Sequence, residues 1–254
     1  MLRLRQIALV AHDLDAVTDE LEAVLGLAIA HRDPAVGVFG LHNAVMPAGQ
    51  QFIEVVAPTR EDTAAGRYLD RRAGDGGYMV ILQCDDHAAA KKRVDELGVR
   101  KVIEQDTDHY GLMQLHPRDT GGSFLEIDLQ VGGDDLDGPW EPAGPEWQKA
   151  RTDTVKGIVA AEILSDDPEA LASRWGRILG RAVLPDDNGR PTIALDNATL
   201  RFVTADDGRG EGLGGIDVAV ASPDQFALAA ARRNLPIDGG TVLLGGVRIT
   251  PVPG

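Results

Sequence analysis

The chain has 254 residues, a length that fits one large domain or two small ones. Its hydrophobic content of 43% is enough for a core, and an aromatic content of only 4% means that aliphatic packing must dominate. The 40 acidic residues outnumber the 25 Lys and Arg and give a net charge of -15, which disfavours nucleic acid and anionic membrane surfaces as partners. The lone Cys84 excludes an internal disulfide framework and fits a reducing, cytoplasmic setting.

The first half of the chain reads as a strand and a helix followed by further strands, and then the same order again. Residues 6–11 are expected to form the first strand, and the helix that follows is capped by Asp13 and closed by Gly26. No stretch has the apolar length of a membrane-spanning helix, and the amino-terminal residues lead into a strand pattern rather than a signal peptide. The later expected elements are strands at 36–45, 51–56, 78–84, 101–105, 111–115 and 123–129, and helices within 59–72 and 85–97.

Two of these expected strands carry a carboxylate in mid-strand. In 51–56, Glu54 shares a face with Phe52 and Val56, and in 123–129 Glu126 shares a face with Phe124 and Asp128. Each carboxylate could be an outward-facing charge on a half-solvated sheet. The alternative is a carboxylate that lines a cup or barrel, where it could bind a metal or move a proton.

The strand and helix order recurs twice in the second half, after a segment rich in Gly, Pro and Asp. We therefore expect a first domain at 1–131, a linker at 132–154 that is pinned by Trp140 and Trp147, and a second domain at 155–254. Four strand–helix–strands modules, paired into two domains, are the simplest account. The segment 210–215 matches the dinucleotide fingerprint by letter but precedes a strand rather than a helix, so it is interpreted as a loose linker and no nucleotide is expected.

The segment 116–126, His-Pro-Arg-Asp-Thr-Gly-Gly-Ser-Phe-Leu-Glu, resembles the closing His-Pro, Gly-Gly and Glu signature of the vicinal oxygen chelate superfamily. That superfamily includes glyoxalases, epimerases, extradiol dioxygenases and bleomycin-resistance proteins. Residues 6–10 are similar to its first strand and residues 52–56 to its inner strand with an acid. The resemblance implies an α+β fold in which four βαβββ modules form two domains with curved mixed sheets.

The resemblance also implies a cup in which four inward side chains hold a divalent metal. Carried over by position, these side chains are Gln6, Glu54, Met79 and Glu126, where the family usually has His at the first and third positions. Gln6, Glu54 and Glu126 could supply oxygen ligands to a hard cation, whereas the Met79 thioether suits Mg²⁺, Mn²⁺ or Ca²⁺ poorly. Without a metal, two facing carboxyl groups could exchange a proton with a carbon next to a carbonyl.

Two classes of function follow for the first-domain cup. The first is an isomerase, epimerase or lyase acting on a carbonyl or carboxylate substrate, with Glu54 and Glu126 as catalytic residues and His42, Met79 and Gln83 contacting the substrate. The second is a non-catalytic protein that binds and sequesters a small molecule. A small-molecule ligand is expected in either case, with no nucleic acid and no membrane, in a monomer or a homodimer. The second domain offers no ligand set and is expected to play a structural part.

Overall fold

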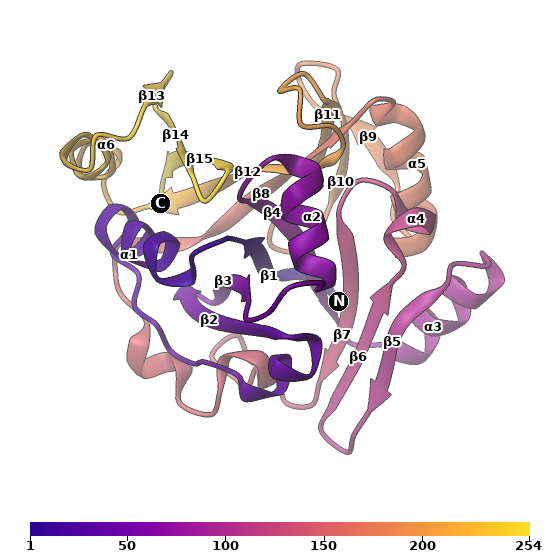
Figure 1. The fold of residues 1–254 in the computed structure, drawn as a ribbon. Coiled ribbons are helices and arrows are strands. Elements are labelled where there is room, and N and C mark those ends of the chain that lie inside the picture. The colour runs from indigo at the N-terminus through magenta and orange to yellow at the C-terminus, as the bar shows by residue number, and fades with distance from the viewer.

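The computed structural model describes residues 1–254 and shows two curved mixed sheets with helices along their edges (Figure 1). The first sheet has seven strands in the order β2 (Leu41–Ala48), β3 (Gln51–Pro58), β1 (Leu2–Val10), β4 (Gly76–Cys84), β7 (Phe124–Gln130), β6 (Tyr110–Leu115) and β5 (Lys101–Asp106). The second has eight strands in the order β13 (Ile237–Asp238), β14 (Thr241–Leu244), β15 (Val247–Pro253), β12 (Gly212–Val220), β8 (Val155–Ser165), β11 (Thr199–Thr204), β10 (Pro191–Ala194) and β9 (Val183–Pro185).

The helices begin and end where short polar residues and glycines provide caps. Asp13 accepts a hydrogen bond from Ala16 N at the start of α1, and Gly26 ends that helix in the left-handed region at φ 66°. The α-helices are α1 (Leu14–Leu25), α2 (Ala64–Arg72), α3 (His87–Glu96), α4 (Pro117–Thr120), α5 (Pro168–Leu179) and α6 (Pro223–Arg232), and the 3-10 helices are η1 (Pro34–Phe39), η2 (Glu141–Ala143) and η3 (Trp147–Ala150). None of the helices is long and apolar enough to cross a membrane.

Each sheet is built from two consecutive modules whose leading strands pair at its centre. Strands β1 and β4 pair antiparallel in the first sheet, and β8 and β12 do so in the second. The modules of β4, β8 and β12 each have three strands after their helix, as a βαβββ unit requires. In the first module one of those strands is reduced to a single bridge between His31 and Val45. The α+β class with two curved mixed sheets is therefore confirmed.

Two sequence predictions about local structure are wrong. The expected strand at 36–45 is split, because Asp33 caps the 3-10 helix η1 and Gly40, at φ 71°, ends it before β2 begins. The expected linker at 210–215 is half strand, because β12 already begins at Gly212. There Gly214 packs against Leu164, whose side chain lies 2.6 Å from where a Cβ would be, so the small residue permits close packing of two strands.

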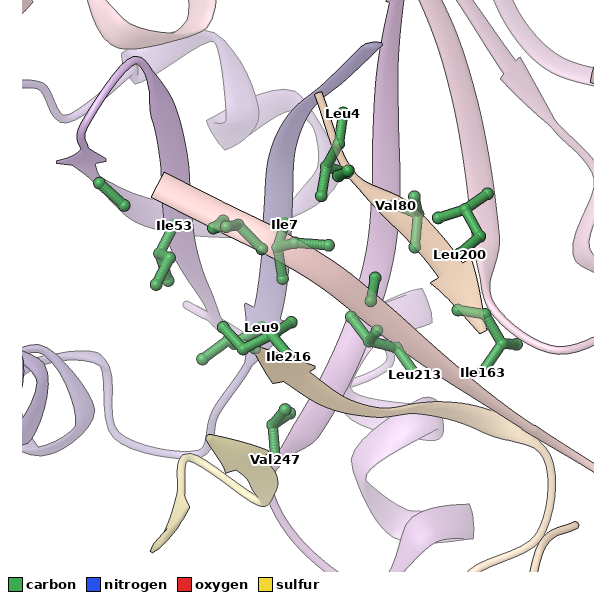
Figure 2. Packing of buried hydrophobic residues seen from close by; sticks show 14 of the residues in the cluster. Leu4, Ile7, Leu9, Ile53, Val80, Ile163, Leu200, Leu213, Ile216 and Val247 are labelled. Carbon is green, nitrogen blue, oxygen red and sulfur yellow. The ribbon is translucent and has the colours of Figure 1, made fainter. Parts of the chain in front are cut away.

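The two sheets pack against each other through the faces that carry their alternate aliphatic residues. A continuous core of 50 buried residues spans both halves of the chain. Leu4, Ile7 and Leu9 of β1 meet Ile163 of β8 and Ile216 of β12 across this interface (Figure 2). Helices α1 and α6 also pack side by side at its edge (Figure 1). The opposite face of the first sheet is consequently turned away from the second sheet.

Candidate functional site

The face of the first sheet that is turned away from the second forms a cup with a cavity of about 500 Å³. Its lining is mostly apolar and aromatic, and its charged members are all acidic, with neither Lys nor Arg among them. Residues from β1, β3, β4 and β7 form the floor, β6 forms one wall, and η1 and η2 lie at the rim. The polar and aromatic lining residues are Gln6, Asp33, Phe39, Asn43, Glu54, Tyr78, Tyr110, Gln114, His116, Phe124, Glu126 and Glu141.

An irregularity in β1 decides which of its side chains enter the cup. Leu2 and Leu4 belong to the shared core, and strict alternation would put Gln6 there as well. The pairing of β1 with β4 shifts between Leu4 and Gln6, so that Arg5 lies in a bulge. After the bulge Ile7 and Leu9 face the core, while Gln6 and Ala8 line the cavity.

Glu54 lies on the floor of the cup and accepts hydrogen bonds from two side-chain amides. Its Oε2 is 2.8 Å from Gln6 Nε2, and its Oε1 is 2.6 Å from Asn43 Nδ2. Burial raises the pKa of Glu54, the two amide donors lower it, and the charge of Asp33 at the rim raises it further. The net pKa lies above the ordinary carboxyl value, which brings this group towards the range of a general base at neutral pH.

Trp140 fixes the orientation of the Gln6 amide. The indole Nε1 of Trp140 lies 2.8 Å from Gln6 Oε1, and both side chains are 1% exposed. An indole nitrogen can only donate, so it requires the amide oxygen on its side and leaves the Gln6 NH₂ group for Glu54. The linker between the two sheets therefore sets the hydrogen-bonding state of a residue on the cup floor.

Glu126 faces the cup from β7 in a different environment. Its Oε2 accepts from Gln114 Nε2 at 3.2 Å, and the same amide lies 3.5 Å from the Met79 sulfur. Asp128 lies two residues along the same strand face, where its Oδ2 accepts a hydrogen bond from Tyr110 Oη at 2.5 Å. Burial and then the charge of Asp128 raise the pKa of Glu126 well above its ordinary value.

The register of the sheet places the two glutamates on opposite sides of the cup floor. Glu54 is paired with Ala8, and Glu126 with Ile81, while β1 and β4 lie between their strands. Three strand spacings separate the two backbones by about 14 Å. The floor between them is formed by the small Ala8 and by Met79 and Ile81. A small molecule lying on this apolar strip would have a carboxyl group on either side.

The cavity is lined by all four positions that the resemblance implies as metal ligands, which are Gln6, Glu54, Met79 and Glu126. Their donor atoms do not fit a hard divalent cation. The Gln6 oxygen is held by Trp140, and both Glu54 oxygens accept from amide NH₂ groups. Met79 adds only a soft thioether. A metal would require rotation of the Gln6 amide and loss of the Trp140 hydrogen bond.

Two residues expected to contact a substrate lie outside the cavity lining. His42 is exposed at the edge strand β2, whose Leu41 and Asn43 point into the cup instead. The strand prediction of 36–45 ran through a 3-10 helix and therefore could not fix which face His42 would take. Gln83 shares a strand face with Met79 but lies beyond the cup, where it accepts hydrogen bonds from Arg3 and donates to Gly133 O.

Several polar residues around the two glutamates were missed by the sequence reasoning. Asn43 and Gln114 each donate to a cup carboxyl group, Trp140 orients Gln6, and Tyr110 donates to Asp128. Alternation within 41–48 and 110–115 could have indicated Asn43 and Gln114 as inward residues. The sequence indicates that Trp140 pins the linker, but nothing in the local pattern indicates Gln6 as its partner, which is 134 residues away.

The second sheet also carries charged side chains on the face turned away from the core. Arg201 lies 3.0 Å from Glu162 and 3.1 Å from Asp217, and Arg248 pairs with Glu162 at 2.5 Å. These charges compensate one another within the sheet. The four side chains come from four different strands, β8, β11, β12 and β15.

The fold and the cup define the class of the protein. The sequence model of the glyoxalase-like domain family matches residues 7–179, which is more than half of the chain. The chain belongs to this family, within the vicinal oxygen chelate superfamily. The match begins in β1 and ends with α5, so it extends from the first sheet across the linker into the second half.

Among known proteins, the chain is 25% identical over 133 residues to the ethylmalonyl-CoA/methylmalonyl-CoA epimerase of Cereibacter sphaeroides, which covers 50% of this chain and 96% of the epimerase. A hypothetical protein from Staphylococcus aureus has a similar structure, with a TM-score of 0.67 and 14% identity over 99% of this chain and all of the other. A mutant of 4-hydroxymandelate synthase from Streptomyces coelicolor gives a TM-score of 0.66 and 16% identity, covering 91% of this chain and 75% of the synthase. The two structural likenesses show the shared two-sheet fold.

Proposed function

We propose that the first-sheet cup binds a small, largely apolar carbonyl compound and moves a proton on the carbon next to its carbonyl group, as an isomerase or epimerase does. The observation that carries this proposal is the pair of buried carboxyl groups on opposite sides of one apolar floor, in different hydrogen-bond environments. The distant likeness to the Cereibacter sphaeroides epimerase supports the same reaction class. Environments that separate the protonation states of two carboxyl groups are typical of an acid and base pair.

The hydrogen bonds assign a role to each glutamate. Glu54 receives two N–H donors, which favour its carboxylate form, so it is the base that removes the proton. The electrons of the broken C–H bond pass into the carbonyl group as an enolate. Glu126, whose pKa is raised further, is the acid that returns a proton to carbon from the other side. Return of a proton to the opposite face inverts the carbon, and return to a different carbon isomerises the compound.

The charge of the cavity restricts the substrate. The lining contains Asp33, Glu54, Glu126 and Glu141 and neither Lys nor Arg. A free carboxylate or phosphate group inside the cup would meet no opposite charge and would lose its hydration. We therefore propose a neutral carbonyl group at the reacting end.

Proton exchange with solvent tests this function. A panel of small neutral aldehydes, ketones and thioesters is incubated in D₂O with the wild-type protein, and deuterium uptake next to the carbonyl is followed by proton NMR. Glu54→Gln and Glu126→Gln should each slow the exchange by about 10²–10⁴-fold, the usual range for one acid or base. Glu96→Gln, on the surface of α3, serves as the control and should leave the rate unchanged. Equal exchange in all four proteins would refute the proposal.

A second candidate is sequestration of an organic cation. It is favoured by the acidic lining together with the aromatic side chains of Tyr78, Tyr110 and Phe124, which can hold a cation over their ring faces. Thermal unfolding is measured with an aromatic quaternary ammonium compound, its neutral isostere and its carboxylate analogue. Stabilisation by the cation alone, lost in Glu54→Gln and accompanied by no proton exchange, would favour sequestration over catalysis.

A further inference from the structure

The mouth of the cup is bordered by apolar side chains that the rest of the chain leaves half uncovered. Phe39 of η1 is 50% exposed and Val102 of β5 is 48% exposed, and both line the cavity. Val36 and Ile103 also belong to the lining and are only partly buried. Large apolar side chains that gather around one opening mark a place where an apolar ligand or partner binds.

These side chains come from the two opposite edges of the first sheet. The edge strand β2 packs against η1, and β5 is the other edge strand, with five strands between them (Figure 1). Since residues of η1 and of β5 line the same cavity, the curvature of the sheet brings both edges to one opening. Glu54 on β3 lies nearer the η1 edge and Glu126 on β7 nearer the β5 edge. Apolar contacts therefore border the cup beyond each of the two glutamates.

The 3-10 helix η1 is held at both ends but buries none of its side chains. Its sequence is Pro-Ala-Val-Gly-Val-Phe, without a polar side chain. At its start, Asp33 caps the helix, and the Asp33 backbone N–H donates to Asn43 Oδ1 at 2.7 Å. Beyond its end, Thr59 N donates to Gly40 O at 2.8 Å. Because the Asn43 amide also donates to Glu54, this apolar helix is anchored to the residue that holds the proposed base.

The size and charge of the cavity indicate what covers these side chains. A volume of about 500 Å³ lies within the range of about 300–1,000 Å³ that holds drug-sized ligands. A compound with little more than a carbonyl group would leave much of this volume unfilled. The charged lining residues are all acidic, so an anionic extension of the ligand would be repelled. An uncharged apolar extension fits both the volume and the lining.

We propose that the ligand of the cup is a carbonyl compound with a long apolar tail, such as a straight alkyl chain, and that Phe39 and Val102 select it by covering this tail at the mouth. The inference rests on the proposed function for the carbonyl end and adds the class of substrate. When the tail is bound, Phe39 and Val102 lose the water that covers about half of each side chain, which stabilises the complex in proportion to the apolar area buried. A chain too short to reach the mouth gains nothing from either residue.

The straight-chain methyl ketones from 2-butanone to 2-octanone test this selection. Each Kd is measured by NMR titration of the nitrogen-15-labelled protein. In the wild type, each added CH₂ group should tighten binding by about fourfold. Phe39→Ser and Val102→Ser should each weaken the binding of 2-octanone by about fourfold or more, because about half the burial of a large apolar side chain is lost. The same variants should change the Kd of 2-butanone by less than about twofold.

Val38→Ser is the matched control. Val38 belongs to the same 3-10 helix and is 74% exposed, but it does not line the cavity. This variant should leave every Kd unchanged, and thermal unfolding should show that all the serine variants remain folded. A Kd that does not depend on chain length in the wild type overturns the proposal. An equal loss for 2-butanone and 2-octanone, or equal effects of Val38→Ser and Phe39→Ser, overturns it as well.

Sedimentation velocity distinguishes a bound tail from a second copy of the chain as the cover of the mouth. If the tail is the cover, Phe39→Ser and Val102→Ser should sediment like the wild type at the concentrations of the titration. A wild-type dimer that these two substitutions dissociate would show that the mouth is an interface between copies, and it would overturn the proposal.

The outcome is separable from that of the proposed function, because binding is measured without any reaction. If Kd depends on chain length and on Phe39 while no ketone exchanges deuterium, the tail site stands and the proposed reaction fails. If exchange depends on Glu54 and Glu126 but its kcat/KM does not rise with chain length, the reaction stands and the tail site fails. If both stand, Phe39→Ser should lower kcat/KM for 2-octanone by about fourfold or more and leave that for 2-butanone nearly unchanged.

Discussion

Replacement of Trp140 by Phe tests how the linker controls the cup. The substitution keeps an aromatic ring beside Tyr110 but removes the N–H group that binds Gln6 Oε1. Gln6 is 1% exposed, so its oxygen would be left buried without a donor, at a cost of about 1–3 kcal/mol. For a chain of this size, each kcal/mol lowers Tm by about 2–4 °C.

Trp147→Phe is the matched control. Trp147 is as buried as Trp140, its Nε1 donates to Gly138 O at 3.1 Å, and its ring packs against Phe52 with the centroids 5.0 Å apart. This substitution also removes one indole hydrogen bond, and a similar loss of stability is expected. It leaves the Gln6 amide untouched.

The two variants should differ at Glu54. Once Trp140 no longer holds the Gln6 oxygen, the amide can rotate, and Glu54 loses a fixed donor to its carboxylate. The pKa of Glu54 should therefore rise in Trp140→Phe and stay unchanged in Trp147→Phe. Urea unfolding gives the stabilities, and carbon-13 NMR titration of the Glu54 carboxyl gives the pKa. An equal effect of both variants on Glu54, or none in Trp140→Phe, would refute the reasoning.

Three further predictions follow from particular contacts. Gly77→Ala should destabilise the protein by about 1–3 kcal/mol or more, because the added Cβ would lie 2.3 Å from Leu213 O between the sheets. Gly37→Ala is the control and should change the free energy of unfolding little, because there is open space around Gly37. The free energy of unfolding of the wild type, relative to that of Glu126→Gln, should fall as the pH rises from about 4.5, because the folded state keeps a proton that the unfolded chain releases. The fall should reach up to about 1.4 kcal/mol per pH unit. Chemical unfolding of both proteins at several pH values measures this difference. Mn²⁺ titration followed by electron paramagnetic resonance should reveal no binding that Glu126→Gln abolishes, and stoichiometric binding lost in that variant would contradict the donor geometry of the cup.

Much of the framework could be predicted from local patterns. Caps such as Asp13 and Gly26 mark helix ends through rules that act over a few residues, and the structure confirms both. Alternation within single strands places Glu54 with Val56 and Glu126 with Phe124 on the cavity side. The misplaced start of β2 shows the limit of reading alternation alone, because Asp33 and Gly40 bound a 3-10 helix within the stretch that alternates like a strand.

The sequence by itself determined the acidity, the repeated modules and the two mid-strand carboxyl groups, because strand periodicity and capping depend on neighbours in the chain. The tertiary structure alone decided the hydrogen-bond partners and the pKa direction of those two carboxyl groups. The bulge at Arg5 turns Gln6 into the cup, Trp140 fixes the Gln6 amide, and Gln114 donates a hydrogen bond to Glu126. Hydrogen bonds between distant segments, together with burial away from water, set the orientation and the pKa of these side chains. Neither effect can be inferred from a local stretch of sequence.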